Sequence, residues 1–427
     1  MIRQYIQQVF YSIRQQKLLS GITIGATALT ICLIMFIVML QQIRTMSFAP
    51  ESNRDKTLYV RWGTVSSDGS LDNTSNGPMG IKVIDRLKAV LNEPEEITFL
   101  NYYPLPMNVS EPGSSKGMLA DIKYTDDAYF RVFDFRFLEG EAFNKDQYDT
   151  KAQVAVVSKD IANKLFESIN VVGRTLEVNH TPYRIVGVVD NVSTITPWAY
   201  GQIWLSFNVD NFLWDVTSFS GPFSLAMKFK SSDQFGAARQ EFDAAIAEYN
   251  KELAPFKLSF RNQPDDINTA NERIWANTSP DMKHIKFERL LTILILLLIP
   301  AVNLGAMSQG LMRQRIAEIG VRRAFGSKQS SIILQLINEN LILVLISGLC
   351  GFVLSIGMIL LFGSDFFAST TASMSTMSMD QIDLMMLLQP QIFVLTLLFC
   401  FVFNLLSCGI PAWIACRRNI VYALHYK

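Results

Sequence analysis

The sequence predicts an integral membrane α-helical protein with four transmembrane helices and one large α+β extracytoplasmic domain. Three observations lead to this fold class. Four long stretches are apolar and almost free of charge, and a long polar region separates the first stretch from the second. Charged residues make up only 18 % of the chain, below the roughly 25 % that is usual in soluble domains.

A membrane-spanning helix needs about 20 apolar residues to cross roughly 30 Å of hydrocarbon. Four stretches are long enough, at residues 18–40, 290–308, 336–362 and 392–414. A buried helix of a large soluble protein is the alternative, and four such stretches in one chain argue against it. We interpret the first stretch as an uncleaved anchor, because it is too long for a signal peptide and no small-residue cleavage site follows it.

Residues 1–17 predict a cytoplasmic amphipathic helix that leads into the first span. Apolar residues recur there at helical spacing, while arginine and glutamine fill the other face. Such a helix lies along a membrane surface or packs on a partner protein, and the sequence leaves both open.

Lysine and arginine near the ends of the spans predict the orientation. Basic residues precede the first span, fill the segment at 309–335 and return in the tail at 415–427. The loop at 363–391 contains neither lysine nor arginine. Both termini and the segment at 309–335 are therefore predicted to be cytoplasmic, and the region at 41–289 and the loop at 363–391 to lie outside.

The outer region at 41–289 predicts a mixed α and β domain. Strand, helix and strand patterns follow one another at 57–103 and again at 223–261, with further strands and a helix at 153–189 between them. Ser279 and Pro280 resemble an N-cap and a first helical residue. A stalk helix at 279–289 is therefore expected to run on into the second span.

The segment that follows the second predicted span carries a distinctive motif. It begins RQRIAEIGVRRAFGSKQ at Arg313 and resembles the signature of the FtsX/MacB superfamily of ABC-transporter permeases, the type VII group. The end of the chain, PAWIACRRNIVYAL at 411–424, resembles the ending of the same family, with Ile420 at a common proline position. Residues 128–143 and 164–189 look like the MacB-type periplasmic core domain.

The resemblance implies a domain arrangement and a location. Residues 56–128 and 222–262 would form a porter-like subdomain, and residues 129–221 an inserted sabre-like subdomain. The chain would lie in a bacterial inner membrane with its large domain in the periplasm. Two permease chains would pair, as a homodimer or a heterodimer, and bind ABC ATPase subunits. A periplasmic adaptor or outer-membrane partner is left open.

The same resemblance implies that residues 309–335 contain the coupling helix that docks on the ATPase. Its charged and apolar side chains suit a partner surface, Gly320 permits close backbone approach, and Gly326 permits a helix to stop. A loop made basic only by the orientation rule is the alternative. The residues assigned to coupling are Arg313, Arg315, Glu318, Ile319, Gly320, Arg322, Arg323, Phe325 and Gly326.

Small residues mark one face of the first span, at Gly21, Gly25 and Ala28. Small residues at this spacing let helices approach closely. Packing within the chain and a dimer interface both fit, and the resemblance favours the dimer.

No phosphate-binding G-x-x-x-x-G-K-[ST] motif occurs in the sequence. We therefore expect a non-catalytic permease subunit without a cofactor or metal of its own, with ATP and Mg²⁺ on a separate ATPase chain. The net charge of zero gives no case for binding nucleic acid. No charged residue lies in the core of a predicted span, which favours mechanotransmission over a polar conduit.

The expected function is export or extraction of a peptide, an antibiotic or a lipoprotein, driven by motion of the periplasmic domain. One alternative is an FtsX-like regulator that signals across the membrane and transports nothing. Another is a ligand sensor or adhesin without an ATPase. The sequence does not name the cargo.

Overall fold

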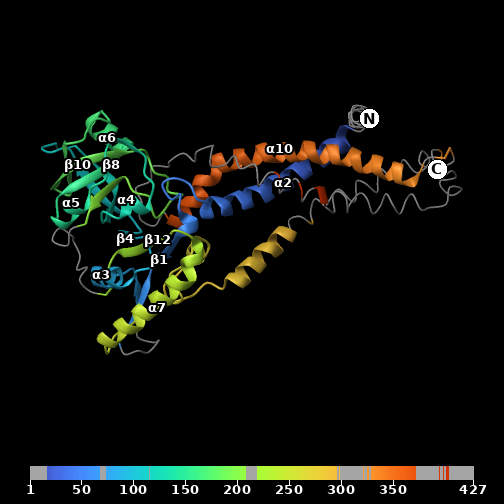
Figure 1. Cartoon of the computed structure of the whole chain (residues 1–427). Coiled ribbons are helices and arrows are strands. Elements are labelled where there is room, and N and C mark those ends of the chain that lie inside the picture. The colour runs from blue at the N-terminus through green and yellow to red at the C-terminus, as the bar shows by residue number, and fades with distance from the viewer. Residues whose placement is uncertain are drawn as a thin grey trace. The chain divides into compact units, whose positions relative to one another are not determined.

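A computed structural model describes residues 17–67, 74–114, 116–207, 219–295 and 328–371, with isolated positions at 298, 321, 325, 326, 394, 398, 401 and 402. The chain divides into two units (Figure 1). The membrane unit comprises Met1–Gln42, Lys283–Gly363 and Asp383–Lys427, and the outer unit comprises Ile43–Met282 and Ser364–Ile382.

Two helices of the described residues are long and apolar enough to cross a membrane. Helix α2 (Lys17–Thr45) contains the candidate span Ile24–Thr45, and helix α10 (Gln329–Thr371) contains Leu341–Phe362. They correspond to the first and third predicted spans. The second and fourth predicted spans lie mostly outside the described residues, so the total of four stays a prediction.

Helices α2 and α10 lie side by side in the membrane unit, as Figure 1 shows. Gly351 of α10 makes this possible, because a Cβ there would lie 2.7 Å from the main-chain oxygen of Ala28 and 3.0 Å from Cβ of Ile31. Near this contact, the Cys32 Sγ lies 3.5 Å from the Met358 Sδ. A residue without a side chain thus lets the two backbones approach closely.

The outer unit is built on a ten-stranded sheet with the order β1-β12-β4-β6-β11-β8-β10-β9-β5, and β7 pairs with β10. Strand β5 also pairs with β6, so six of the strands form a closed ladder. The bounds are β1 Thr57–Val60, β4 Glu96–Asn101, β5 Leu105–Ser110, β6 Gly117–Thr125, β7 Phe137–Gly140, β8 Val154–Ser158, β9 Thr175–Val178, β10 Thr181–Val189, β11 Ile203–Ser206 and β12 Phe223–Lys228.

Strands distant in sequence meet in this sheet. Strand β12 lies between β1 and β4, with Leu58 opposite Met227 and Phe223 opposite Asn101. A second sheet has the order β13-β2-β3, formed by Lys257–Ser259, Gly63–Ser66 and Thr74–Gly77. The helices of the outer unit are η1 Arg54–Lys56, α3 Ile81–Val90, α4 Tyr129–Val132, α5 Lys145–Asp149, α6 Lys159–Phe166, η3 Ser232–Gln234, α7 Phe235–Glu252 and α8 Ile267–Glu272.

Both faces of the large sheet are buried. On β12, Leu225 and Met227 join one apolar cluster with α3 and α7, while Ala226 between them joins a second cluster on the other face. This alternation follows from the two-residue period of a strand. The second cluster is rich in aromatic rings and contains Trp198 and Trp204.

The strands and helices expected at 57–103, 153–189 and 223–261 are confirmed as β1, α3, β4, β8, α6, β10, β12, α7 and β13. The predicted start of the stalk at Ser279 is wrong: the helix begins at Met282, and the Ser279 Oγ accepts a hydrogen bond from Asn262 Nδ2. The division between porter-like and sabre-like segments at residue 128 stays a prediction. Sheet pairings join strands from both segments, β6 with β11 among them.

Candidate functional site

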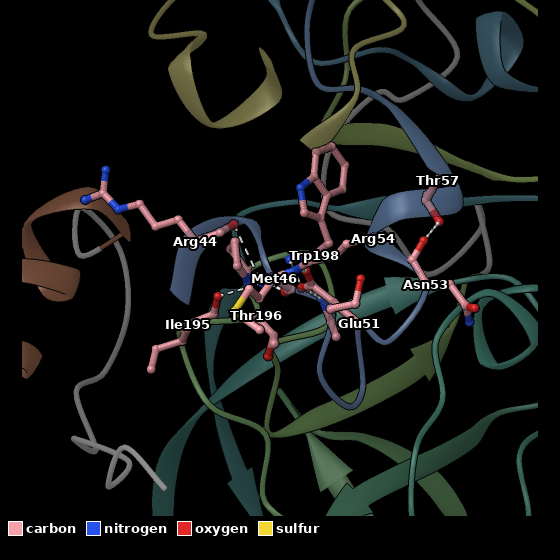
Figure 2. Close-up of polar contacts among 12 residues, drawn as sticks. Arg44, Met46, Glu51, Asn53, Arg54, Thr57, Ile195, Thr196 and Trp198 are labelled. Carbon is pink, nitrogen blue, oxygen red and sulfur yellow. Dashed lines mark hydrogen bonds and ion pairs between the residues drawn. The ribbon is translucent and has the colours of Figure 1, made fainter. Parts of the chain in front are cut away.

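Arg54 binds the end of helix α2 within the outer unit (Figure 2). Its Nη1 donates hydrogen bonds to the main-chain oxygens of Ile43 at 3.1 Å and Met46 at 2.8 Å, with Arg44 further away at 3.4 Å. The last carbonyls of a helix have no partner within the helix, and they carry partial negative charge. A buried guanidinium therefore caps α2 where the membrane segment ends.

Glu51 completes this cap as the ion-pair partner of Arg54. The Arg54 Nε lies 2.6 Å from Glu51 Oε2, and both side chains are almost fully buried. The other carboxylate oxygen of Glu51 accepts hydrogen bonds from the backbone N–H groups of Trp198 at 2.8 Å and Ala199 at 2.9 Å. The Arg54 Nη2 donates to the carbonyl of Ile195 at 2.9 Å. The pair thus joins the end of α2 to the loop after β10.

That loop is held from its other side by buried polar groups. The Lys123 Nζ donates to the carbonyls of Pro197 and Trp198, each at 3.0 Å. The hydroxyl of Tyr129 shares its one proton between the carbonyls of Trp198 and Ala199, at 3.1 and 2.9 Å. Burial lowers the pKa of Lys123 to about 7, although Glu51 and Asp121 act to raise it.

A second arginine holds the segment that leads toward the second predicted span. The Arg273 Nε and Nη2 bind the two oxygens of Asp265 at 2.5 and 2.9 Å, a bidentate pair that is almost fully buried. Arg273 also donates to the carbonyls of Thr278 at 2.6 Å and Arg261 at 3.0 Å. Burial raises the pKa of Asp265, against the opposing effect of Arg273.

Asn271 connects the two arginine centres. It lies in α8, between Asp265 and Arg273, and its Nδ2 donates to the carbonyl of Arg44 at 2.6 Å. The backbone of Asp265 in turn exchanges both of its hydrogen bonds with Tyr59 of β1 at 2.8 Å. We call Glu51, Arg54, Asp265, Asn271 and Arg273 the joint residues.

The energetics of the joint favour a fixed geometry. Removing one partner of a buried ion pair commonly costs about 3–5 kcal/mol, because the other charge is left buried and uncompensated. Here both charged pairs also bind main-chain groups, so their orientations are fixed by several hydrogen bonds at once. The arrangement can hold a helix end rigidly, and it contains no nucleophile paired with a base. Within the described ranges, no group of three His, Cys, Asp or Glu residues could hold a metal ion.

Seven of the residues predicted for coupling lie outside the described residues: Arg313, Arg315, Glu318, Ile319, Gly320, Arg322 and Arg323. Phe325 is 88 % exposed, and its backbone N–H donates to the carbonyl of Val321 at 3.1 Å. Gly326 follows with φ of 89°, a conformation that favours glycine. A role of these residues in coupling stays a prediction.

The three small residues of α2 differ in their surroundings. Ala28 is buried against Gly351 of α10 in the same chain. A Cβ at Gly21 or Gly25 would meet nothing within 4 Å. The structure thus assigns Ala28 to packing within the chain, and a dimer contact at the two glycines stays a prediction.

Sequence reasoning did not find the joint residues. Charged residues near the ends of membrane spans are expected to be exposed to water. Nothing in a single sequence marks Arg54 or Arg273 as buried. One signal was available: Glu51 and Arg54 stand three residues apart, directly after an apolar helix whose last carbonyls require donors.

Two family models match the chain in succession. The MacB-like periplasmic core domain matches residues 18–245, and the FtsX-like permease C-terminal domain matches residues 290–420. The chain belongs to the FtsX/MacB family of ABC-transporter permeases. This confirms the resemblance seen in the motif at Arg313 and in the outer domain.

Relatives of known function include the macrolide export ATP-binding/permease protein MacB of Escherichia coli K12 and of Shigella flexneri. Each is 25 % identical over 267 residues, which cover 58 % of this chain and 36 % of the relative. The chain therefore spans little more than a third of the length of these relatives.

Two solved structures are also similar in part. The extracellular domain of the noncanonic ABC-type transporter YknZ from Gram-positive bacteria is 16 % identical with a TM-score of 0.35, covering 47 % of this chain and 99 % of that domain. The periplasmic region of MacB from Actinobacillus actinomycetemcomitans is 17 % identical with a TM-score of 0.33, covering 47 % of this chain and 88 % of that region.

Proposed function

We propose that this permease works with an ABC ATPase carried on a separate chain, and that ATP hydrolysis there moves the periplasmic domain to export or extract a peptide, an antibiotic or a lipoprotein. The chain pairs with a second permease chain in the inner membrane, with both termini in the cytoplasm. Residues 309–335 dock on the ATPase. Membership of the family supports this proposal, because its relatives combine an ATP-binding part with a permease part.

The observation that carries the mechanical part of the proposal is the arginine cap on α2. Hydrogen bonds of the kind that Arg54 makes have donor–acceptor distances of about 2.7–3.2 Å. A displacement of the α2 end by about 1 Å relative to Arg54 would therefore break several of them together. Breaking these hydrogen bonds would leave buried charges unpaired. The outer domain therefore moves with the end of α2 and does not separate from it.

Asn271 extends this argument to the second connection. A movement of the Arg44 carbonyl acts directly on α8, and Arg273 lies at the end of that helix. The two segments that connect the outer unit to the membrane unit, one at the end of α2 and one after α8, thus move together. This suits a domain that moves as one rigid body. Transmission of motion through packed, hydrogen-bonded elements needs no polar conduit across the membrane.

The docking half of the proposal is tested by purification of the tagged full chain in mild detergent, with Gly320→Arg and Arg322→Glu variants alongside. We expect an ABC ATPase to copurify with the wild type and to be lost from both variants. If no ATPase copurifies with the wild-type chain, the proposed transporter function is wrong and a receptor function takes its place.

The transmission half is tested on the copurified complex by limited proteolysis with and without ATP and vanadate. In the wild type, we expect trapped nucleotide to change the cleavage pattern of the outer unit. A Glu51→Met, Arg54→Met double variant keeps the volume of the pair without its charge, and it should hydrolyse ATP while losing that change. Arg86→Met with Glu252→Met, which removes an exposed ion pair, is the matched control.

A further inference from the structure

A cavity of about 590 Å³ opens in the outer unit. Its lining comes from both sheets and from the segment after α8: Trp62, Asn76, Gly77, Pro78, Tyr103, Trp275, Ala276 and Asn277. The lining thus includes three aromatic residues and two asparagines, without an acidic or basic residue among them. Cavities of this size and mixed character are typical of small-molecule sites.

Arg61 lies against Trp62 and Tyr103, two of the residues that line the cavity, and against the neighbouring Tyr102. Its guanidinium carbon is 4.2 Å from the centre of the Trp62 ring and 4.0 Å from that of Tyr102, and a terminal nitrogen donates to the Tyr103 hydroxyl. Its Nε is buried without a hydrogen-bond partner, and no ion pair of Arg61 occurs among the described residues. The positive charge beside the cavity is therefore not neutralised by a carboxylate in the described part of the chain.

The cavity lies close to the end of a membrane span. Asn271 binds the Arg44 carbonyl on the last turn of α2, whose candidate span ends at Thr45. Trp275 stands four residues further along, so its Cα lies within about 14 Å of that of Asn271. The side chains of Ile274 and Trp275 are 73 % and 68 % exposed. Tryptophan is enriched at the membrane–water interface.

We propose that this cavity binds an anionic phospholipid of the outer leaflet, with the phosphate and glycerol region held between the rings. The rings of Trp62, Tyr103 and Trp275 cover the apolar part of such a ligand. The amide of Asn277 can donate to phosphate oxygens, and so can the second N–H of Asn76 Nδ2, which already donates to Thr74 Oγ1 at 3.4 Å. The Arg61 guanidinium lies against the rings of Trp62 and Tyr103 and makes the electrostatic potential in the cavity more positive. The rings exclude water, so they screen this charge less than water would.

The same geometry disfavours a cationic ligand. Aromatic cages bind quaternary ammonium groups through the faces of their rings. Here Arg61 already occupies the faces of Trp62 and Tyr102, and its charge repels a second cation. The site therefore discriminates phosphatidylglycerol from phosphatidylcholine by charge. It binds lipid whether or not the chain works with an ATPase, so it does not depend on the function proposed above.

The test uses the full-length chain in phosphatidylcholine nanodiscs without ATP. Each sample contains a trace of phosphatidylglycerol or of phosphatidylcholine with the same photoactivatable group, and crosslinked peptides are identified by mass spectrometry. We expect phosphatidylglycerol to label the peptides that contain Trp62 or residues 275–277 at least fivefold more than phosphatidylcholine does.

Asn277 offers a pair of variants of opposite sign that remove no packed side chain, because it is exposed. One unit charge about 4 Å from a phosphate in water changes binding roughly fivefold. Asn277→Asp should lower the phosphatidylglycerol labelling about fivefold, and Asn277→Lys should raise it by a similar factor. Asn163, exposed on α6, provides matched controls as Asn163→Asp and Asn163→Lys, which should change nothing.

Equal labelling by the two lipids would overturn the proposal. Equal phosphatidylglycerol labelling of the wild type, Asn277→Asp and Asn277→Lys would also overturn it. Millimolar inorganic phosphate distinguishes the two sources of a phosphate group. Labelling that persists in its presence supports a lipid as the occupant. Labelling that free phosphate abolishes would overturn the membrane source and assign the site to a soluble anion.

Discussion

The side-chain amide of Asn271 donates a 2.6 Å hydrogen bond to the main-chain carbonyl of Arg44. The two residues are far apart in the sequence, and each stands beside a different connection of the outer unit to the membrane unit. One hydrogen bond therefore links the end of the first span to the segment that precedes the second.

Asn271→Ala removes this link while leaving both arginine pairs in place. A single hydrogen bond of this kind contributes about 1 kcal/mol, so the apparent melting temperature of the detergent-solubilised chain should fall only slightly. Hydrogen exchange should report the loss more directly, because the last turn of α2 is held by fewer contacts. We expect faster exchange at the amides of residues 42–46.

Asn92→Ala is a suitable control, because Asn92 binds Glu241 on the exposed surface, away from α2 in sequence. It should leave exchange at residues 42–46 unchanged. Unaltered exchange there in Asn271→Ala would show that the hydrogen bond does not hold the end of the helix.

The arginine pairs predict a strongly non-additive response. Arg54→Met leaves the Glu51 carboxylate buried beside backbone N–H groups without its cation, and the cost should be about 3–5 kcal/mol. Removing both charges with methionine should cost much less than the sum of the two single variants. Apparent melting temperatures of the four proteins in one double-mutant cycle measure this coupling. Additive single effects would contradict the pairing.

The local elements of the outer unit were largely predictable from sequence. Alternation at Thr57–Val60 and helical period at Ile81–Val90 depend on neighbours in the chain, and the structure has β1 and α3 there. The pairing of β1 with β12 was not predictable, because it depends on contacts such as Leu58 with Met227 that a single sequence does not reveal.

The joint residues illustrate a second limit of prediction from sequence. Arg44, Arg54 and Arg273 are the same residue type near span ends, yet Arg44 is only half-buried, while Arg54 and Arg273 are buried and bind carboxylates. Which arginine caps the helix depends on where the chain turns after Thr45. That turn is set by tertiary contacts with the loop around Trp198, so no local pattern could identify it.

Lys123 predicts a pH dependence of stability. Its pKa in an unfolded chain is near 10.5, and burial lowers it to about 7 in the folded protein. Between these values the unfolded chain binds a proton that the folded chain does not, so stability rises with pH by up to about 1.4 kcal/mol per unit. Below pH 7 both states are protonated, and this contribution to the slope disappears.

Lys123→Met should remove that slope. The apparent melting temperature of the wild type, relative to the variant, should rise from pH 7 to pH 9 and stay level from pH 6 to pH 7. Lys164→Met, at a half-exposed lysine on α6, should follow the wild type throughout. A constant difference between wild type and Lys123→Met across this range would mean that Lys123 is not titrating.

Gly351 supports the last prediction, which concerns the packing of α10 on α2. A leucine at position 351 would place Cβ 2.7 Å from the main-chain oxygen of Ala28, which cannot rotate out of the way. Overpacking of this kind costs about 1–3 kcal/mol, so Gly351→Leu should lower the apparent melting temperature in detergent.

Gly357→Leu is the matched control on the same helix, because a Cβ there meets nothing within 4 Å. Both changes replace glycine with a better helix former, so a gain in helix propensity appears equally in each and cancels in their difference. If the two variants melt at the same temperature, the two helices do not pack through Gly351, and the small-residue face of α2 is free to serve a second permease chain at Ala28 as well as at Gly21 and Gly25.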